Sequence, residues 1–193
     1  MAEPNVSAIL LAAGLSRRMG FDKLFLLHHG KSFLQTAVDL LSNLPVYEKI
    51  IVTTAARLNK IILPPGIRVE INGQPETGQS GSLKLGVLAS NGDCFFFMNA
   101  DQPGLTLSDL LPLLNAARGN KDKIVYPSVK GNPSSPALFP ARFRAELLAL
   151  TGDTGGKPVR AAHPEACLAV EADNPDNFFD VDDIFDKMDY KID

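Results

Sequence analysis

The stretch VSAILLAAGLSRRMGFDKL, residues 6–24, starts as an almost unbroken apolar run and then changes into a segment of glycine, serine and cations. The apolar run at 6–12 has the pattern of a strand that is buried on both faces of a parallel sheet. Such a strand needs helices on both sides of the sheet. The stretch therefore predicts an α/β fold in which a basic, glycine-containing loop follows the first strand.

Strand-like and helix-like apolar patterns alternate along the rest of the chain. We expect strands at 49–54, 67–71, 93–98, 124–126 and 168–170. We expect helices from Ser32, where Ser32 and Gln35 match a capping box, over 78–90, from Thr106, over 141–150 and near the C-terminus. This alternation predicts a single domain, residues 1–193, with a three-layer α/β/α sandwich and a mostly parallel sheet.

Composition limits the kinds of protein that this chain can be. Its 193 residues are 45% hydrophobic and carry a formal net charge of −3, so we expect one ordinary core and no nucleic-acid partner. No apolar run reaches membrane-spanning length, and Glu3 and Pro4 lie where a signal peptide has basic residues. We therefore expect a soluble cytoplasmic protein with no membrane partner. Cys94 and Cys167 have no CxxC or ligand-spaced histidine, which argues against a zinc site.

The loop at 13–23 has the chemistry of an oligophosphate site. Parallel sheets bind ligands at the carboxyl ends of their strands, which places this loop, 72–82 and 99–105 at one edge. The loop offers flexible backbone, a hydroxyl and positive charge through Gly14, Gly20, Ser16, Arg17, Arg18 and Lys23. Its spacing fits neither a Walker motif nor GxGxxG. An exposed turn with solvated cations is the alternative.

The other two loops add hydroxyl groups and a carboxylate. Gly78, Ser80 and Ser82 can present backbone and hydroxyl groups to a nucleobase, or they can form a turn and a helix cap. Asp101 can cap a helix or lie beside the phosphates. A carboxylate about 6 Å from a phosphate oxygen is repelled by roughly 0.7 kcal/mol in water and by about 3 kcal/mol at an effective dielectric constant of 20. A cation between them is favoured, and Mg²⁺ fits because it prefers oxygen ligands.

The acidic tail can supply a second metal ligand. In FFDVDDIFDKM, residues 178–188, the candidates are Asp180, Asp182, Asp183 and Asp186, and a solvated tail is the alternative. The three histidines, His28, His29 and His163, form no catalytic pattern with serine or cysteine. Covalent catalysis is therefore not indicated. Phosphoryl-type transfer needs positioning and charge neutralisation, which these loops supply.

The motif LAAGLSRRMGFDK at 11–23 closely resembles the LAAGxSxRMGxxK signature of the molybdenum cofactor nucleotidyltransferases. These enzymes have a nucleotide-diphospho-sugar transferase-like, Rossmann-like fold. Further segments resemble the family in the same order: GQSGSLKLG (78–86), ADQPGLT (100–106), NPSSPALFP (132–140), LLALTGDTGG (147–156) and FDVDDIFD (179–186). The resemblance covers nearly the whole chain.

The resemblance implies a reaction and its residues. A phosphate oxygen of molybdopterin attacks the α-phosphate of an NTP, and pyrophosphate is released. The implied nucleotide-binding residues are Leu11, Ala12, Ala13, Gly14, Ser16, Arg17, Arg18, Lys23, Gly78, Ser80 and Ser82. Lys23, Arg18 and Asp101 would act in catalysis, and Asp101 and Asp182 would hold Mg²⁺. The loops near 131–136 and 151–156 would receive the acceptor.

The nucleotide and the partners follow from finer features of the resemblance. Family members that use GTP typically carry LAGG where this chain has LAAG at 11–14. The chain therefore looks most like the molybdenum cofactor cytidylyltransferases, and we expect it to transfer CMP from CTP, with GTP as the alternative. A client molybdoenzyme or its chaperone is a further expected partner. The chain departs from the family where Asp183 and Ile184 replace Thr-Pro and where Ser135 replaces a histidine. These departures affect the second metal ligand and the acceptor.

Three other functions stay open at the level of sequence. The chain can be a guanylyltransferase or an NTP transferase for another phosphorylated small molecule. It can also be a nucleotide-binding module without catalytic activity. A nicotinamide-dependent oxidoreductase is disfavoured, because the glycine fingerprint and an acidic ribose ligand are missing.

Overall fold

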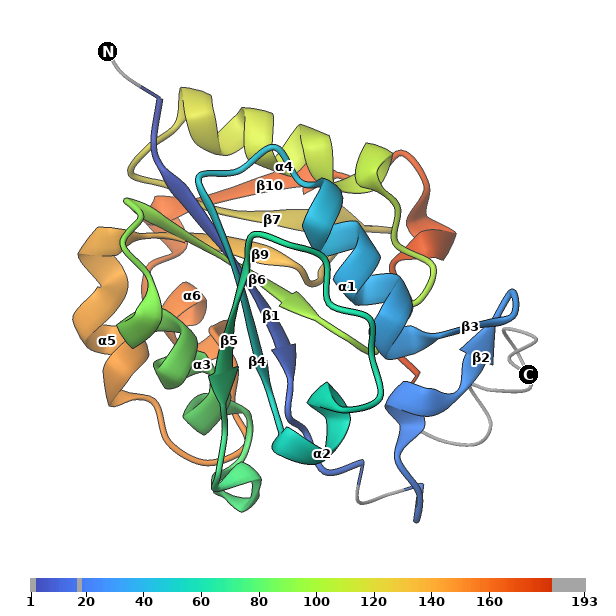
Figure 1. Cartoon of the computed structure of the whole chain (residues 1–193). Coiled ribbons are helices and arrows are strands. Elements are labelled where there is room, and N and C mark those ends of the chain that lie inside the picture. Colours follow the sequence, from blue (N-terminus) through green and yellow to red (C-terminus); the bar gives the residue numbers. More distant parts are fainter. Residues whose placement is uncertain (1–2, 17–18, 182–193) are drawn as a thin grey trace.

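Strand β1 (Val6–Ala12) lies inside the sheet, and all seven of its residues are buried. In the computed structural model, which describes residues 3–16 and 19–181, β1 pairs in parallel with β4 (Glu48–Thr53) and β6 (Cys94–Asn99). Leu10 of β1 lies opposite Ile51 on one side and Met98 on the other. The first apolar run is therefore a doubly covered strand, as the sequence predicts (Figure 1).

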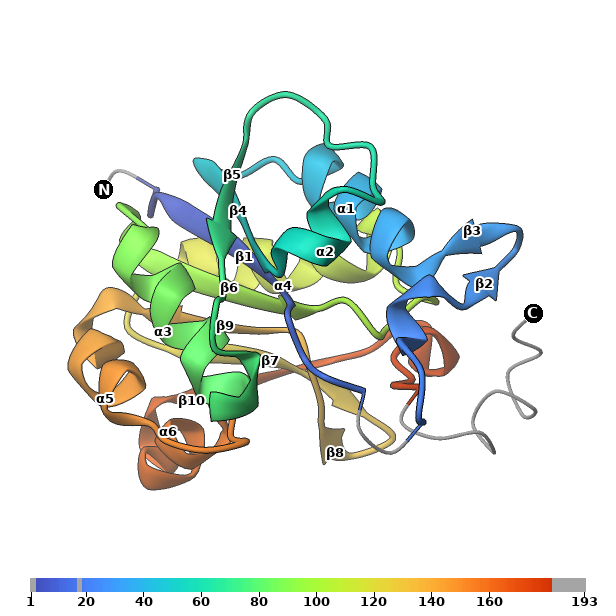
Figure 2. The same ribbon diagram turned by 60° about the horizontal axis from the view of Figure 1, so that its bottom comes forward.

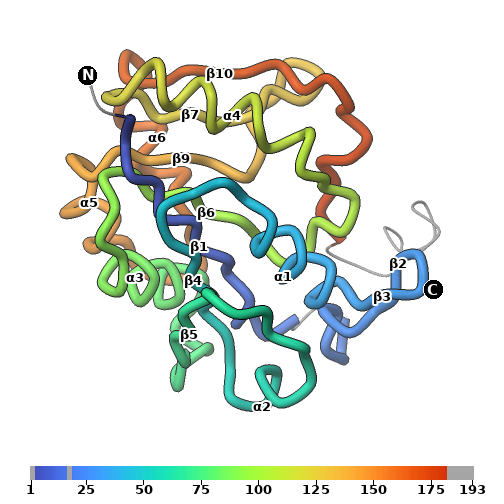
Figure 3. The backbone as a smooth tube through the Cα atoms, turned by 45° about the horizontal axis from the view of Figure 1, so that its top comes forward, coloured from blue at the N-terminus to red at the C-terminus, as the bar shows by residue number. Residues whose placement is uncertain are grey.

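The sheet extends on both sides of these three strands. Its order is β10-β7-β9-β6-β1-β4-β5, and β8 pairs with β7 off this path (Figure 3). The remaining strands are β5 (Ile67–Ile71), β7 (Ile124–Val129), β8 (Asn132–Pro133), β9 (Ala137–Pro140) and β10 (Cys167–Glu171). A separate hairpin joins β2 (Leu27–His28) and β3 (Lys31–Ser32).

Helices cover both faces of the sheet. The helices are α1 (Phe33–Asn43), α2 (Ala55–Leu58), α3 (Gln79–Ala89), α4 (Leu107–Gly119), α5 (Arg144–Ala149) and α6 (Lys157–Ala162). Ala8 and Leu10 of β1 share a core with α1 and α4, whereas Ile9 and Leu11 share a second core with α3, α5 and α6. The predicted three-layer α/β/α sandwich is confirmed. Among the described residues, no helix has both the length and the apolar character that crossing a bilayer requires.

Strand β9 is the main departure from the predicted elements. It runs antiparallel to β6 and β7, with Phe139 opposite Phe95. The prediction missed it because ALFP is too short an apolar run to separate a strand from a loop. The hairpin β2–β3 and the short helices α2 and α6 were also not predicted. The expected C-terminal helix lies outside the described residues.

Helix α1 begins where its cap predicts, but the cap has a different form. The Ser32 hydroxyl accepts a hydrogen bond from the Gln35 backbone N–H at 3.2 Å. The Gln35 side chain does not return to Ser32; it donates to Asp39 and exchanges hydrogen bonds with the backbone of Ile62. The reciprocal half of the expected capping box is therefore wrong, because Gln35 instead ties the helix to a neighbouring loop.

Parallel pairing brings the expected loops to one edge. Leu11 of β1 lies opposite Asn99 of β6, and Ala12 lies opposite Thr53 of β4. The chain therefore leaves β1, β4 and β6 on the same side of the sheet. Figure 2, which turns the bottom of Figure 1 forward, shows this edge with α2 beside it.

Asp109, in the first turn of α4, binds the segment at 174–177. Its carboxylate accepts hydrogen bonds from the backbone and hydroxyl of Thr106 and from the side chains of Asn174 and Asn177. Burial acts to raise the pKa of Asp109, but the hydrogen bonds outweigh it and hold the pKa below its usual value. Asp109 therefore connects α4 to the C-terminal segment.

Replacing Asp109 with alanine should lower the free energy of unfolding by about 1–3 kcal/mol at pH 7, because partly buried hydrogen bonds lose their charged acceptor. Because the folded-state pKa is depressed, this contribution is present above the unfolded value of about 3.9 and is lost as pH falls through the lower folded value. Denaturant titrations of wild type and Asp109→Ala should therefore converge at acid pH. The exposed Asp122→Ala variant is the control, and an equal loss there would contradict the assignment.

Candidate functional site

The loop after β1, residues 13–23 and here called the β1 loop, forms a tight turn at its described positions. Ser16 and Gly20 have positive φ angles of 49° and 70°. The Ser16 hydroxyl accepts a hydrogen bond from the Lys23 backbone N–H at 3.3 Å, and its carbonyl accepts one from Met19 N–H at 3.0 Å. Predicted residues Arg17 and Arg18 lie outside the described residues. Ser16 therefore connects the first part of the loop to Lys23.

Lys23 and Asp101 form an ion pair at the centre of the candidate site. Lys23 Nζ lies 2.7 Å from Asp101 Oδ2, and it also donates to the carbonyl of Val181 at 2.8 Å. The Val181 N–H donates in turn to the carbonyl of Asp101 at 3.1 Å. The side chains of Lys23 and Asp101 are only 14% and 22% exposed. Three segments that are distant in sequence thus meet at one cation and one carboxylate.

Asp101 has a free coordinating oxygen that fits a divalent cation. Its Oδ1 is buried and receives no hydrogen bond from the described residues, while Oδ2 is bound to Lys23. A carboxylate oxygen is the ligand type that Mg²⁺ prefers. The described residues contain no group of three or more Asp, Glu, His or Cys side chains suited to a metal. Asp182, the predicted second ligand, lies outside the described residues.

The predicted base-binding segment, 78–82, packs against the loop at 151–156, which is one of the two predicted acceptor loops. Ser80 N–H donates to the carbonyl of Gly152 at 3.2 Å, and Gln79 N–H donates to Asp153 Oδ1 at 3.2 Å. The Ser82 hydroxyl already accepts a hydrogen bond from Asn72 at 3.0 Å. Ser80 and Ser82 are both buried. The segment from Gly78 to Ser82 is therefore held in place from both sides.

A chain of amides connects this segment to the predicted acceptor loop. Gln79 Nε2 donates to Asn99 Oδ1 at 3.1 Å, and Asn99 Nδ2 lies 3.4 Å from the Ser135 hydroxyl. Gln102 Nε2 donates to the Ser135 carbonyl at 3.2 Å. Ser135, which occupies the position of the family's histidine, therefore lies beside the candidate site. Gln79 and Asn99 could not be identified from the sequence, because single amide side chains give no spacing signal.

The first predicted nucleotide residues are largely buried. Leu11, Ala12 and Ala13 are at most 9% exposed, whereas Gly14 is exposed. The Leu11 carbonyl accepts a hydrogen bond from Ala100 N–H, and the Ala12 carbonyl accepts one from the Thr53 hydroxyl. These contacts fix the start of the β1 loop against the ends of the two neighbouring strands.

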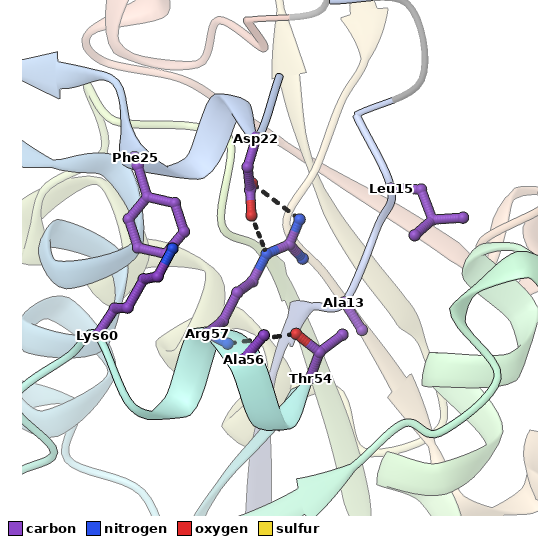
Figure 4. A pocket seen from close by; sticks show the side chains of 8 residues that line it. All are labelled: Ala13, Leu15, Asp22, Phe25, Thr54, Ala56, Arg57 and Lys60. Carbon is purple, nitrogen blue, oxygen red and sulfur yellow. Dashed lines mark hydrogen bonds and ion pairs between the residues drawn. The ribbon is translucent and has the colours of Figure 1, made fainter. Parts of the chain in front are cut away.

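A pocket of about 200 Å³ lies between the β1 loop and α2 (Figure 4). Its lining consists of Ala13, Leu15, Asp22, Phe25, Thr54, Ala56, Arg57 and Lys60. Of these, only Ala13 is among the residues predicted from the sequence. Arg57 is 5% exposed, and its guanidinium binds Asp22 at the end of the β1 loop. No local signal identifies Arg57, since its partners lie far away in the sequence.

Comparison with known proteins provides an independent line of information. Residues 8–167 match the family model described as the MobA-like NTP transferase domain. A protein of Rhodopirellula baltica named "probable molybdenum cofactor guanylyltransferase" is 33% identical over 130 residues. The match covers 64% of this chain and 61% of that protein, so the chain spans less than two thirds of this relative's length.

Solved structures share the fold at lower identity. A nucleotidyl transferase from Methanothermobacter has a TM-score of 0.79 and 23% identity, over 95% of this chain and 94% of its own. A Mycobacterium tuberculosis protein, solved in complex with manganese, has a TM-score of 0.69 and 18% identity, over 87% of this chain and 89% of its own. These likenesses support the fold described above.

Gly78 gives a test of the contact between the two loops. Its φ angle is +87°, and an added Cβ would lie 2.6 Å from Gly152 backbone atoms and 2.7 Å from Asp153 N. Gly78→Ala should therefore lower the free energy of unfolding by about 1–3 kcal/mol, as measured by denaturant titration. Gly73→Ala is the matched control, because its methyl group meets nothing within 4 Å. Similar stability of both variants would show that the loops are not held together.

Proposed function

Because this chain belongs to the MobA-like NTP transferase family, we propose that it transfers the nucleoside monophosphate part of an NTP to a phosphorylated small molecule. An oxygen of the acceptor's terminal phosphate forms a bond to the α-phosphorus. The bond from this phosphorus to the bridging oxygen of the β-phosphate breaks, and pyrophosphate leaves with the electron pair. No covalent intermediate with the protein is needed.

The ion pair of Lys23 and Asp101 is the observation that carries this proposal. It places a cation from the β1 loop and a carboxylate from the loop after β6 2.7 Å apart at the carboxyl edge of the sheet. Phosphoryl-type transfer depends on such positioned charges. In the ligand-free protein Lys23 neutralises Asp101. When a triphosphate binds, we expect the Lys23 ammonium to move toward the phosphate oxygens and offset their charge.

Asp101 would hold Mg²⁺ through its unpartnered oxygen, and the family resemblance makes Asp182 the proposed second ligand. When bound, the ion would neutralise charge on the transferred phosphate group. The M. tuberculosis protein, which is 18% identical, was solved in complex with manganese, and this supports the proposal of a divalent cation. Arg18, Arg17, Ser16 and the backbone from Leu11 to Gly14 remain proposed ligands of the nucleotide.

We propose a molybdopterin-type phosphate as acceptor and GTP as donor. The name of the R. baltica relative supports both choices. CTP, which the sequence motif favours, is the second candidate because Ala13 stands where GTP-using members carry glycine. The loop of Ser135 lies beside Asn99 and Gln102 and is the proposed acceptor side of the site. A client molybdoenzyme or its chaperone remains a proposed partner.

The donor can be tested directly. We expect pyrophosphate release when the protein is incubated with Mg²⁺, molybdopterin and GTP, measured by a coupled phosphate assay, and little release with CTP, ATP or UTP. Release with CTP alone would move the assignment to the cytidylyltransferase. Nucleotide binding without release from any NTP would contradict the transferase and favour a non-catalytic module.

Asp101→Asn should reduce pyrophosphate release more than tenfold, a change in barrier above ~1.4 kcal/mol, because the neutral amide removes both the proposed metal ligand and the partner of Lys23. Lys23→Ala should weaken both nucleotide binding and the rate. Asp122→Asn on the exposed surface is the control, and thermal melting should confirm that each variant folds. Retention of more than about a tenth of the wild-type rate by Asp101→Asn would remove Asp101 from the metal role.

A further inference from the structure

We propose that Arg57 is a positioning residue that holds both ends of the β1 loop and thereby sets Lys23 opposite Asp101. Its role in catalysis rests on the proposed function. Its role in holding the loop does not, and the two can be tested separately.

Arg57 uses its whole guanidinium on the β1 loop and on the residue that precedes it. Nη1 donates to the carbonyl of Ala12 at 2.7 Å, and Nη2 donates to the carbonyl of Gly14 at 2.6 Å. Nε and Nη2 bind the two oxygens of Asp22 at 2.7 and 2.9 Å. One side chain therefore joins the start of the loop to its end, and Figure 4 shows its bonds to Asp22.

The contacts of Asp22 carry this restraint to Lys23. Asp22 Oδ1 also accepts a hydrogen bond from Leu24 N–H at 3.2 Å, and so caps the short turn Lys23–Phe25. Lys23 is the first residue of that turn, and its ammonium binds Asp101. The order of contacts is thus Arg57 to Asp22, Asp22 to the turn, and the turn to Asp101. Fixing a reacting group in advance lowers the entropy cost of reaching the transition state.

The choice of arginine fits this role better than a general packing role. Arg57 is the third residue after Thr54, the N-cap of α2, so it lies in the short helix that follows β4, the strand next to β1. Packing alone at this place needs only an apolar side chain. The planar guanidinium can in addition bind two carbonyls and both carboxylate oxygens together. Lysine presents a single point of charge and cannot make this set of contacts.

The first test measures the loop without any enzyme assay. Lys23 supplies a trypsin site at the end of the β1 loop, in the turn that Asp22 caps. We expect Arg57→Lys and Arg57→Ala to be cut after Lys23 at least about tenfold faster than wild type, as followed by mass spectrometry. Arg68→Ala is the matched control, because Arg68 pairs with Glu48 at 3.6 Å elsewhere in the sheet. Unchanged cleavage of the Arg57 variants would overturn the proposal, whatever the activity.

The second test measures the consequence for the reaction. With the NTP that wild type uses, Arg57→Ala and Asp22→Asn should each lower kcat/KM about tenfold or more, and the double variant should be little worse than either single one. Additive losses would overturn the route through Asp22. If Arg57→Ala does not fold, Arg57→Lys and Asp22→Asn open the same contact and complete the test. Wild type without turnover would refute the proposed function, while the cleavage rates would still decide whether Arg57 holds the loop.

Discussion

The ion pair between Lys23 and Asp101 depends on the pairing of two strands. Because β1 and β6 run side by side in the same direction, with Leu11 opposite Asn99, the loops that follow them leave the sheet together. The short distance between cation and carboxylate then follows from the register of the sheet. A shift of that register would separate the two charges. Each charge would then be partly buried without a partner, which is costly in free energy. The fold and the candidate site are therefore specified by the same contacts.

Much of the sheet could be predicted from the sequence because its strands carry their signal locally. Val6–Ala12 and the aromatic run of β6 are apolar segments of ordinary strand length, and Ile67–Ile71 alternates apolar with charged residues. β9 could not be predicted, because its four residues form a strand only through their neighbours on both sides. Short elements such as α2 depend in the same way on tertiary contacts.

The candidate site shows the same division. Lys23 and Asp101 stand in motifs that mark them as charged groups at loop positions, and the parallel topology brings them together as expected. Arg57 stands in an unremarkable segment, and its importance comes from carbonyls and a carboxylate that only the folded chain places around it. The preferred nucleotide is a finer property than either. The sequence motif predicts CTP from a single methyl group at Ala13, whereas the R. baltica relative is named for guanylyl transfer.

The reversed direction of β9 has an architectural consequence. An antiparallel strand begins where its neighbours end, so the chain enters β9 at the carboxyl edge and brings Ser135 there on the way in. The loops that follow β1, β4, β5 and β6 leave the sheet at that edge, whereas the segment 130–136 enters it and reaches Asn99 and Gln102 through Ser135. A change of length or sequence within 130–136 therefore also alters the hydrogen bonds of the loop after β6, so evolution or engineering would have to change the two segments together.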